Sequence, residues 1–304
     1  MKRIHIVGSN SRSGTTLMAE LMVSSFLIDL YSPHERRIHK WPPSSAISAN
    51  IFLTKKPRDI LVVEPLIKIM PNLYVIYLVR DPRDSVVSIH GKDPNRYWTN
   101  LGFWKIYFPY AQKLKAHPRF IVVRYEDLVT NPDQIQNYLM ERMPFLIKKA
   151  SFSEYHLWAN PSRDSMLALK GVRPLETGSI GNWRKHLPRL AGQIKIHGSI
   201  SQDLIHYGYE QDNSWEKELE GIEPDLEPSH WPEDAAQKRL RHWMRGRWIK
   251  AFWVKFGHNP LVLKARSIFS RNPELSKNFL FFILGKVIYL ITSPLTSSLF
   301  TEVI

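Results

Sequence analysis

Short apolar runs alternate with stretches of helical periodicity over the first half of the chain. The apolar runs are typical of buried strands and lie at 2–7, 73–79 and 119–125. Apolar positions recur at helical spacing near 14–29, 82–91, 101–116 and 132–142. This alternation predicts an α/β fold with a doubly wound parallel sheet, in which a ligand lies beyond the carboxyl ends of the strands.

The segment 59–70 stays ambiguous between strand and helix. Ile60–Val63 is typical of a strand, whereas Pro65 favours a helix. Periodicity does not decide so short a run, so both interpretations remain open.

The first predicted strand leads into a loop of small polar residues, Gly8-Ser-Asn-Ser-Arg-Ser-Gly-Thr-Thr16. Backbone N–H groups and the positive end of the following helix favour an anion at such a place. The loop departs from the P-loop pattern because Thr15, not lysine, follows Gly14, and Arg12 supplies the charge instead. The loop is therefore P-loop-like, with a turn that caps a helix as the alternative. Its candidate anion ligands are Arg12, Ser13, Gly14, Thr15 and Thr16.

A second polar segment, Arg80-Asp-Pro-Arg-Asp84, follows the strand at 73–79. Pro82 suits the first position of a helix. Ser88 lies eight residues after Arg80, a little over two turns at about 3.6 residues per turn. Arg80 and Ser88 are therefore candidates to bind one phosphate, and a salt-bridged helix cap is the alternative.

Together the two segments resemble the sulfotransferases that use 3′-phosphoadenosine 5′-phosphosulfate (PAPS). The loop from Arg12 to Thr16 is similar to the one with which that family binds the 5′-phosphosulfate, and the resemblance implies that Arg80 and Ser88 hold the 3′-phosphate. Val123–Leu128 and His206–Glu210 extend the resemblance, which covers roughly residues 1–210. The loop is closer to the Golgi and bacterial branches than to the cytosolic one, which favours a macromolecular or surface acceptor.

A third segment, Gly178–His186, is similar to the part of these enzymes that folds over the nucleotide. The resemblance implies donor contacts from Ser179, Trp183 and Arg184. The alternative is an ordinary helix start anchored by an aromatic residue.

The resemblance also implies catalytic roles for Glu35, Lys55 and Arg12. Glu35 lies 23 residues after Arg12, a spacing similar to that of the catalytic glutamate in the Golgi-type branch, and His34 is the reserve base. Lys55-Lys-Pro57 matches a Lys-x-Pro segment of tyrosylprotein-type enzymes, so Lys55 would polarise the bridging oxygen of the leaving group, a role that Lys56 could share. Solvated loops are the alternatives for both segments.

Composition limits the chemistry. The chain has 304 residues, 43% of them hydrophobic, enough for one substantial core and an extension. It has no cysteine, and its 12 histidines form no H-E-x-x-H or comparable spacing, so we expect no metal. The formal net charge of +14 suits an anionic donor, and nucleic acid is disfavoured because no recognised nucleic-acid motif accompanies the charge.

Composition changes after residue 210. From Glu210 to Asp234 ten acidic residues oppose one lysine, which we interpret as an acidic linker or a solvated wrap over 211–234. Residues 235–273 instead hold ten Lys or Arg and no acid, interleaved with aromatic residues at helical spacing. A basic amphipathic helix with Trp favours an anionic membrane surface, contacted through 235–292, and packing on the catalytic domain or another subunit is the alternative.

Two further expectations concern the membrane and the compartment. The apolar stretch 279–292 has 14 residues, short of the roughly 20 that span a bilayer, so we expect a surface-seated or buried helix, with a span extended to Phe300 as the alternative. Met1-Lys-Arg-Ile leads directly into the first strand, so we expect no secretory signal. The catalytic part should then be cytoplasmic or peripheral on the inner membrane face.

The sequence thus predicts a catalytic domain at 1–210, an acidic linker at 211–234 and a basic, aromatic helical extension at 235–304. The resemblance implies transfer of a sulfuryl group from PAPS, with 3′,5′-adenosine bisphosphate (PAP) as product, to a hydroxyl of a glycan, lipid-linked or other acceptor. One alternative is a P-loop kinase for a small metabolite. The other is a catalytically inactive membrane- or partner-binding protein with a nucleotide fold.

Overall fold

The computed structural model describes residues 1–40 and 48–238, and positions 240, 243, 247, 251 and 254. The chain divides into two compact units, Met1–Trp243 and Met244–Ile304. The second unit lies almost wholly outside the described residues, and so do most of the predicted basic helix and the whole apolar stretch 279–292. Within the described part of the chain, no helix is long and apolar enough to cross a membrane.

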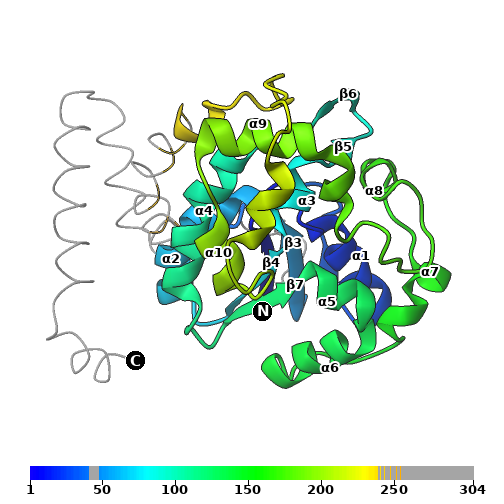
Figure 1. The fold of residues 1–304 in the computed structure, drawn as a ribbon. Helices are drawn as coiled ribbons and strands as arrows, with labels where there is room; N and C mark the ends of the chain where they lie inside the picture. The colour runs from blue at the N-terminus through cyan, green and yellow to red at the C-terminus, as the bar shows by residue number, and fades with distance from the viewer. Residues whose placement is uncertain are drawn as a thin grey trace, which may run out of the picture. The chain divides into compact units, whose positions relative to one another are not determined.

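A five-stranded parallel sheet forms the centre of the first unit (Figure 1). Its strand order is β2-β3-β1-β4-β7. The bounds are Lys2–Gly8 for β1, Leu30–Tyr31 for β2, Ile51–Lys55 for β3, Leu73–Val79 for β4 and Phe120–Arg124 for β7. The α/β fold class predicted from the sequence is confirmed.

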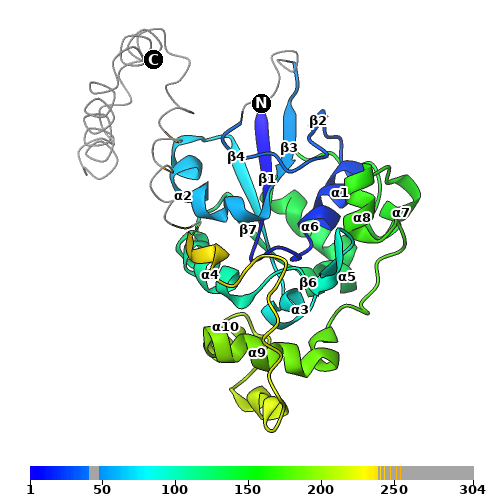
Figure 2. The same cartoon turned by 90° about the horizontal axis from the view of Figure 1, so that it is seen from above.

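Helices cover both faces of the sheet, with α2 and α4 on one side and α1, α5 and α6 on the other (Figures 1 and 2). Their bounds are Thr15–Ser25 for α1, Ile60–Ile69 for α2, Leu101–Leu114 for α4, Tyr125–Thr130 for α5 and Pro132–Arg142 for α6. The ambiguous segment 59–70 is therefore helical. Pro65 lies inside α2, and most of that helix is buried.

The predicted helix at 82–91 is wrong beyond Val86. Helix α3 covers only Pro82–Val86, and the chain then forms a small antiparallel hairpin from β5, Ile89–His90, and β6, Asp93–Tyr97. The apolar residues Val86, Val87 and Ile89 fit a helical pattern, so the sequence did not reveal where the helix ends. So short an apolar run is equally compatible with a β-strand. The sequence analysis also missed β2 and β3.

Shorter helices complete the described unit: α7 at Tyr155–Trp158, α8 at Arg163–Leu169, α9 at Leu187–His197 and α10 at Ser201–His206. Residues 211–234, predicted as a linker or wrap, lie in the first unit with the catalytic part. Trp215 is buried there, and the backbone N–H groups of Asp225 and His230 donate to the carbonyls of Pro188 and Tyr97. We call residues 225–234 the strap.

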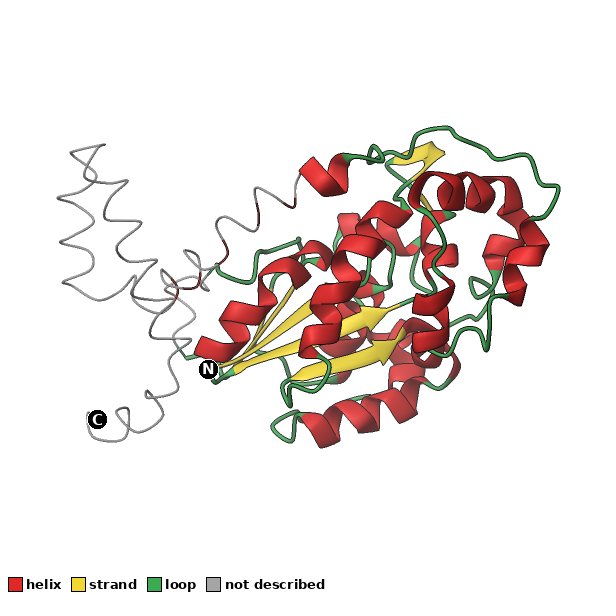
Figure 3. Ribbon diagram, turned by 60° about the vertical axis from the view of Figure 1, so that its left-hand side comes forward, coloured by secondary structure: helices red, strands yellow, loops and turns green. Residues whose placement is uncertain are grey.

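The parallel arrangement determines where functional loops gather. All five strands point the same way (Figure 3), so the segments after β1, β3, β4 and β7 leave from one edge of the sheet. Arg12, Arg80 and Tyr125 lie in the segments after β1, β4 and β7, and Lys55 is the last residue of β3. The fold therefore brings together residues that are more than a hundred positions apart in the sequence.

Ile76 tests how far this sheet depends on the packing of its interior strand β4. Ile76 is fully buried in β4, where it pairs with Ile6 of β1 and Ile121 of β7. We expect Ile76→Ala to lower the free energy of unfolding by about 2–5 kcal/mol, because it leaves a cavity in the core. Ile147→Ala, at a side chain that is 59% exposed, is the matched control and should change it by less than about 0.5 kcal/mol in urea titrations. Equal losses would contradict this account of the core.

Candidate functional site

A cavity of about 980 Å³ opens at the carboxyl edge of the sheet. Its wall includes most of the predicted site residues. Those residues are Arg12, Gly14, Thr15, Thr16, Glu35, Lys55, Arg80, Ser88 and Ser179. Ser13, Trp183 and Arg184 do not line it.

The loop between β1 and α1 turns sharply around the cavity floor. Arg12 and Gly14 both have positive φ, 70° and 91°. A side chain at Gly14 would also collide with Tyr125, because an added Cβ would lie 2.5 Å from its ring. Ser13 is buried, and its hydroxyl donates to the carbonyl of Asn10 at 2.9 Å. Ser13 therefore stabilises the loop from behind.

Two guanidinium groups lie next to each other above this loop. Arg12 donates through Nε to Ser88 Oγ at 3.1 Å, and Arg80 donates through Nη1 to the Arg12 carbonyl at 3.0 Å. The Arg80 guanidinium also lies 4.5 Å from the centre of the Tyr125 ring. Burial, reinforced by the nearby charge of Arg80, lowers the pKa of Arg12 to about 10. Among the described residues neither arginine forms an ion pair, so an anion here would offset both charges.

Lys55 ends β3 and adds a third cation to the cavity. Its Nζ donates to Thr16 Oγ1 at 2.7 Å, which joins the lysine to the first turn of α1. Burial lowers the pKa of Lys55. Thr16 thus holds the ammonium group of Lys55 next to the loop of residues 8–16, which we call the anion loop.

The candidate base, Glu35, lies on the loop after β2 and is half exposed. Its Oε2 is 3.1 Å from Lys56 Nζ. The loop is fixed on both sides, because Arg36 N donates to the Lys55 carbonyl and Ile38 N donates to Asp59 Oδ2 at 2.6 Å. The reserve base, His34, is exposed and has Nδ1 3.4 Å from Asp164 Oδ2. Both residues line the cavity, and Glu35 has the lysine pair beside it.

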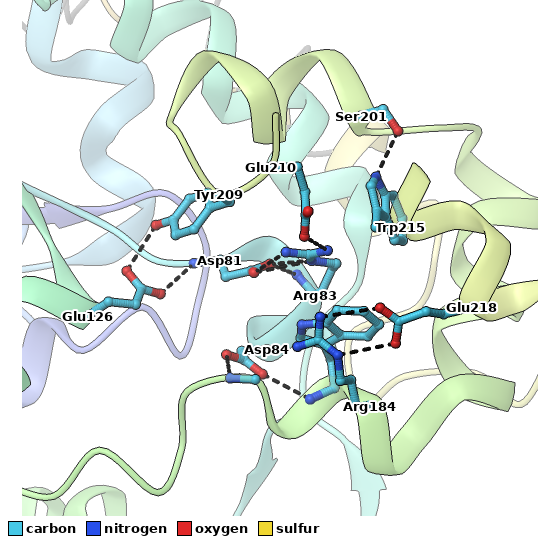
Figure 4. A network of polar contacts seen from close by, with 12 residues as sticks. Asp81, Arg83, Asp84, Glu126, Arg184, Ser201, Tyr209, Glu210, Trp215 and Glu218 are labelled. Atoms are coloured by element: carbon cyan, nitrogen blue, oxygen red, sulfur yellow. Dashed lines mark hydrogen bonds and ion pairs between the residues drawn. The ribbon is translucent and has the colours of Figure 1, made fainter. Parts of the chain in front are cut away.

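The predicted nucleotide-covering segment contributes Ser179 alone of its three predicted contacts. The Ser179 carbonyl accepts from Arg80 Nη2 at 2.9 Å, and its hydroxyl lies 3.0 Å from the Tyr125 hydroxyl. Trp183 is instead buried behind the segment, and Arg184 pairs with Glu218 on the outside (Figure 4). Both latter residues therefore stabilise the segment from outside the cavity.

A buried polar network holds this covering segment to α3 (Figure 4). Asp84 accepts hydrogen bonds from the backbone N–H groups of Gly181 and Trp183, at 2.8 and 2.9 Å. Arg83 pairs with Asp81 at 2.8 Å and Glu210 at 2.6 Å. Its guanidinium lies against two tryptophan rings that also contact each other, 4.3 Å from the ring centre of Trp183 and 5.0 Å from that of Trp215. Of the two arginines in the Arg80–Asp84 segment, Arg80 thus lines the cavity, and Arg83 stabilises the fold through its ion pairs.

The sequence analysis missed two residues of the site. Tyr125 packs on Arg80 and meets Ser179, and its position directly after β7 is the signal that could have identified it. Asp84 was assigned to a possible helix cap, but its partners lie almost a hundred residues away. No local pattern could have revealed that contact.

In the part of the chain that the structure describes, no group of three or more His, Asp or Glu residues could hold a metal ion. Hydrogen-bond donors and cations line the end of the cavity that contains Arg12 and Arg80.

Asp84 provides a test of how the covering segment is held. Asp84→Ala would leave two backbone N–H groups without acceptors, so we expect a loss of about 2 kcal/mol or more in the free energy of unfolding. The amides of Gly181 and Trp183 should exchange hydrogen at least about tenfold faster, because their local opening becomes easier. Glu218→Ala, which removes a largely exposed ion pair of the same network, should cost less than about 1 kcal/mol. Unchanged exchange at the two amides would refute the assigned role.

Comparison with known proteins supports one family. A sequence model described as "Sulfotransferase family" matches residues 37–143, which include Lys55, Arg80 and Ser88. No curated protein matches the chain.

Three similar solved structures are sulfotransferase domains or a related enzyme. A domain from the curacin biosynthetic pathway is 16% identical, with TM-score 0.45, and the match covers 60% of this chain and 91% of that one. A domain from the Synechococcus PCC 7002 olefin synthase is 15% identical, with TM-score 0.40 and coverage of 60% and 87%. Retinol dehydratase, solved with androsterone and PAP, is 13% identical, with TM-score 0.31 and coverage of 81% for both chains.

These structural likenesses are weak, so the assignment depends on the family model and on the residues that it includes. The match begins after the loop of Arg12 and ends before Ser179, and the fold brings both of those segments to the matched residues Arg80 and Ser88. Over residues 37–143 the chain is therefore similar to the sulfotransferase family.

Proposed function

We propose that the protein is a PAPS-dependent sulfotransferase that transfers a sulfuryl group to an acceptor hydroxyl. The observation that carries the proposal is the set of three cations, Arg12, Lys55 and Arg80, around one cavity at the end of a P-loop-like turn. None of the three has an ion-pair partner within 4 Å in the described part of the chain. A donor with two separate phosphate groups would supply that negative charge.

The 5′-phosphosulfate and the 3′-phosphate of the donor would bind at different ends of this set of cations. The backbone N–H groups after Gly14 and the hydroxyls of Thr15 and Thr16 suit the 5′-phosphosulfate, since they open α1. Arg80 and Ser88 suit the 3′-phosphate, and Arg12 lies between the two groups because it contacts Ser88 directly. Ser179 and Tyr125 close the same end of the cavity.

The reaction needs a proton acceptor and a cation at the leaving group. The acceptor oxygen attacks sulfur and forms the new S–O bond, while the bond from sulfur to the bridging phosphate oxygen breaks. Glu35 takes the hydroxyl proton, and Lys55 stabilises the negative charge that gathers on the bridging oxygen of departing PAP. Sulfuryl transfer resembles phosphoryl transfer in depending mainly on positioning and electrostatics, so fixed Arg, Lys and N–H groups suffice.

The proposed acceptors are hydroxyls of glycans or lipid-linked molecules. An anionic membrane surface contacted through 235–292 is part of this hypothesis, and the residues that would make the contact lie outside the described part. The loop form around Arg12 supports a surface or macromolecular acceptor through its resemblance to the Golgi and bacterial branches.

Donor selectivity is the first test. We expect isothermal titration calorimetry to show PAP binding with or without magnesium, and binding of AMP at least about tenfold weaker, because AMP lacks the 3′-phosphate that Arg80 and Ser88 would hold. ADP offers the control for charge, since it has two phosphates but none at the 3′ position. Magnesium-dependent preference for ADP would instead indicate a kinase.

Substitutions should separate binding from chemistry. Arg12→Ala and Arg80→Ala should each weaken PAP binding by roughly 10- to 100-fold, because each removes a charge-assisted contact. Glu35→Gln should leave PAP binding within about twofold and lower kcat by roughly 100-fold or more, since it removes the proton acceptor. Arg163→Ala and Glu154→Gln, at exposed positions outside the cavity, are the matched controls.

Two results would count against these assignments. Loss of PAP binding in Glu35→Gln equal to that in Arg12→Ala would remove Glu35 as the base. PAP binding by the wild-type protein without transfer to any acceptor would favour a binding protein that keeps the nucleotide fold.

A further inference from the structure

The cavity extends past the cations assigned to the donor. Its remaining wall includes the loop of His34 and Glu35, Pro57 and Arg58 after β3, the β5–β6 hairpin, and residues of α7 and α8. Because the candidate base Glu35 lies in this wall, the acceptor hydroxyl must come from this side. The side chains here therefore decide which acceptors fit.

Every carboxylate that lines the cavity already has a partner. Glu35 pairs with Lys56, and Asp164 contacts His34 and Lys92, each at 3.4 Å. Asp84 accepts from the backbone, and Glu176 pairs with Arg173 at 3.2 Å. No lining carboxylate therefore remains to offset a further cation.

Arg58 is a cation that neither these carboxylates nor the proposed donor would neutralise. It is half buried in the turn Pro57–Asp59 and lines the cavity. Among the residues that the structure describes, it forms no ion pair, and its N–H groups have no hydrogen-bond acceptor. Lys170 also lines the cavity without an ion pair in that part of the chain, but it is exposed at the end of α8.

An aromatic ring fixes Arg58 in place. Its guanidinium lies 4.2 Å from the centre of the Trp231 ring, within the range of a cation–π contact. This contact does not use up the N–H groups, which stay available for oxygen atoms. An arginine held in this way is well suited to a carboxylate or a phosphate, because little side-chain entropy remains to be lost on binding.

Trp231 comes from the strap and is itself held. Asn100 Nδ2 donates to its carbonyl at 2.8 Å. Trp98 of the cavity wall lies beside it, stacked between His90 and His230 at ring-centre distances of 4.3 and 4.0 Å. The acidic segment after residue 210 thus supports Arg58 and Trp98 of the cavity wall without lining the cavity itself.

We propose that Arg58 binds an anionic group of the acceptor, so that this protein selects hydroxyl compounds that also carry a carboxylate or a phosphate. This inference rests on the proposed sulfotransferase function. Arg58 would position the acceptor, while Glu35 and Lys55 act on the reacting atoms. A neutral alcohol would leave the half-buried arginine without a counter-charge.

The test uses matched pairs of small acceptors that differ in one anionic group. The pairs are 4-nitrophenyl β-D-glucoside with the glucuronide, methyl 4-hydroxybenzoate with 4-hydroxybenzoate, and glycerol with glycerol 3-phosphate. Binding is measured on the PAP-saturated full chain by ligand-observed NMR, and transfer is measured with radiolabelled PAPS. The first two pairs report on a carboxylate, and the third reports on a phosphate.

We expect the acidic member of at least one pair to be preferred by about tenfold or more, as one charge-assisted contact allows. In Arg58→Gln that preference should fall to about twofold or less, with PAP binding unchanged, because the arginine lies outside the donor contacts. Arg58→Lys should keep an intermediate preference and guards against a misfolded variant. Lys68→Gln, which removes a charge from the exposed side of α2, should keep the full preference.

The outcomes separate the two proposals. If wild-type protein fails to bind PAP, the proposed function is overturned. If PAP binds but no pair shows an acidic preference in binding or transfer, the role of Arg58 is overturned and the donor site stands. A preference that persists in folded Arg58→Gln would likewise overturn it.

Discussion

Arg12 and Arg80 hold two positive charges side by side at the end of the sheet, and the described structure offers neither of them an ion-pair partner. Their partners are the Ser88 hydroxyl, the carbonyls of Arg12, Ala168 and Ser179, and the Tyr125 ring. Such neutral contacts orient a guanidinium without cancelling its charge. An oxyanion that enters here meets preorganised cations, and little reorganisation is needed to bind it.

The positive charges of Arg12 and Arg80 stay uncompensated because the neighbouring carboxylates bind other groups. Three acidic side chains lie in the segments that follow β4 and β7, and each has another partner. Asp81 pairs with Arg83, Asp84 holds the covering segment, and Glu126 accepts from the Asp81 N–H and the Tyr209 hydroxyl at 2.9 and 3.0 Å. Burial raises the pKa of Asp84 and of Glu126. The network in Figure 4 therefore preserves the unbalanced positive charge of the cavity as well as the fold.

Sequence reasoning recovered the parts of the molecule that depend on local pattern. The strands β1, β4 and β7 follow from their apolar runs, and the anion loop follows from the small polar residues between a strand and a helix. Strand β3 was missed, because Ile51–Lys55 is short and leads into a lysine pair that is also typical of a loop. The placement of Trp183 was obscured for another reason. A tryptophan beside a ligand loop can face the ligand or the core, and only the tertiary contact with Arg83 distinguishes them.

The strap shows why composition alone could not reveal that residues 225–234 support the acceptor wall. Acidic residues and prolines are typical of a solvated segment, and Glu227 and Asp234 are indeed exposed. The strap is nevertheless fastened by Arg189, which is almost fully buried and donates to the Glu227 carbonyl and the Ser229 hydroxyl. Arg189 also donates to the Thr99 carbonyl, and the Thr99 hydroxyl donates to Asn10 at the start of the anion loop. One chain of hydrogen bonds thus joins the strap that supports Arg58 to the loop of Arg12, so the two ends of the cavity are fixed by a common scaffold.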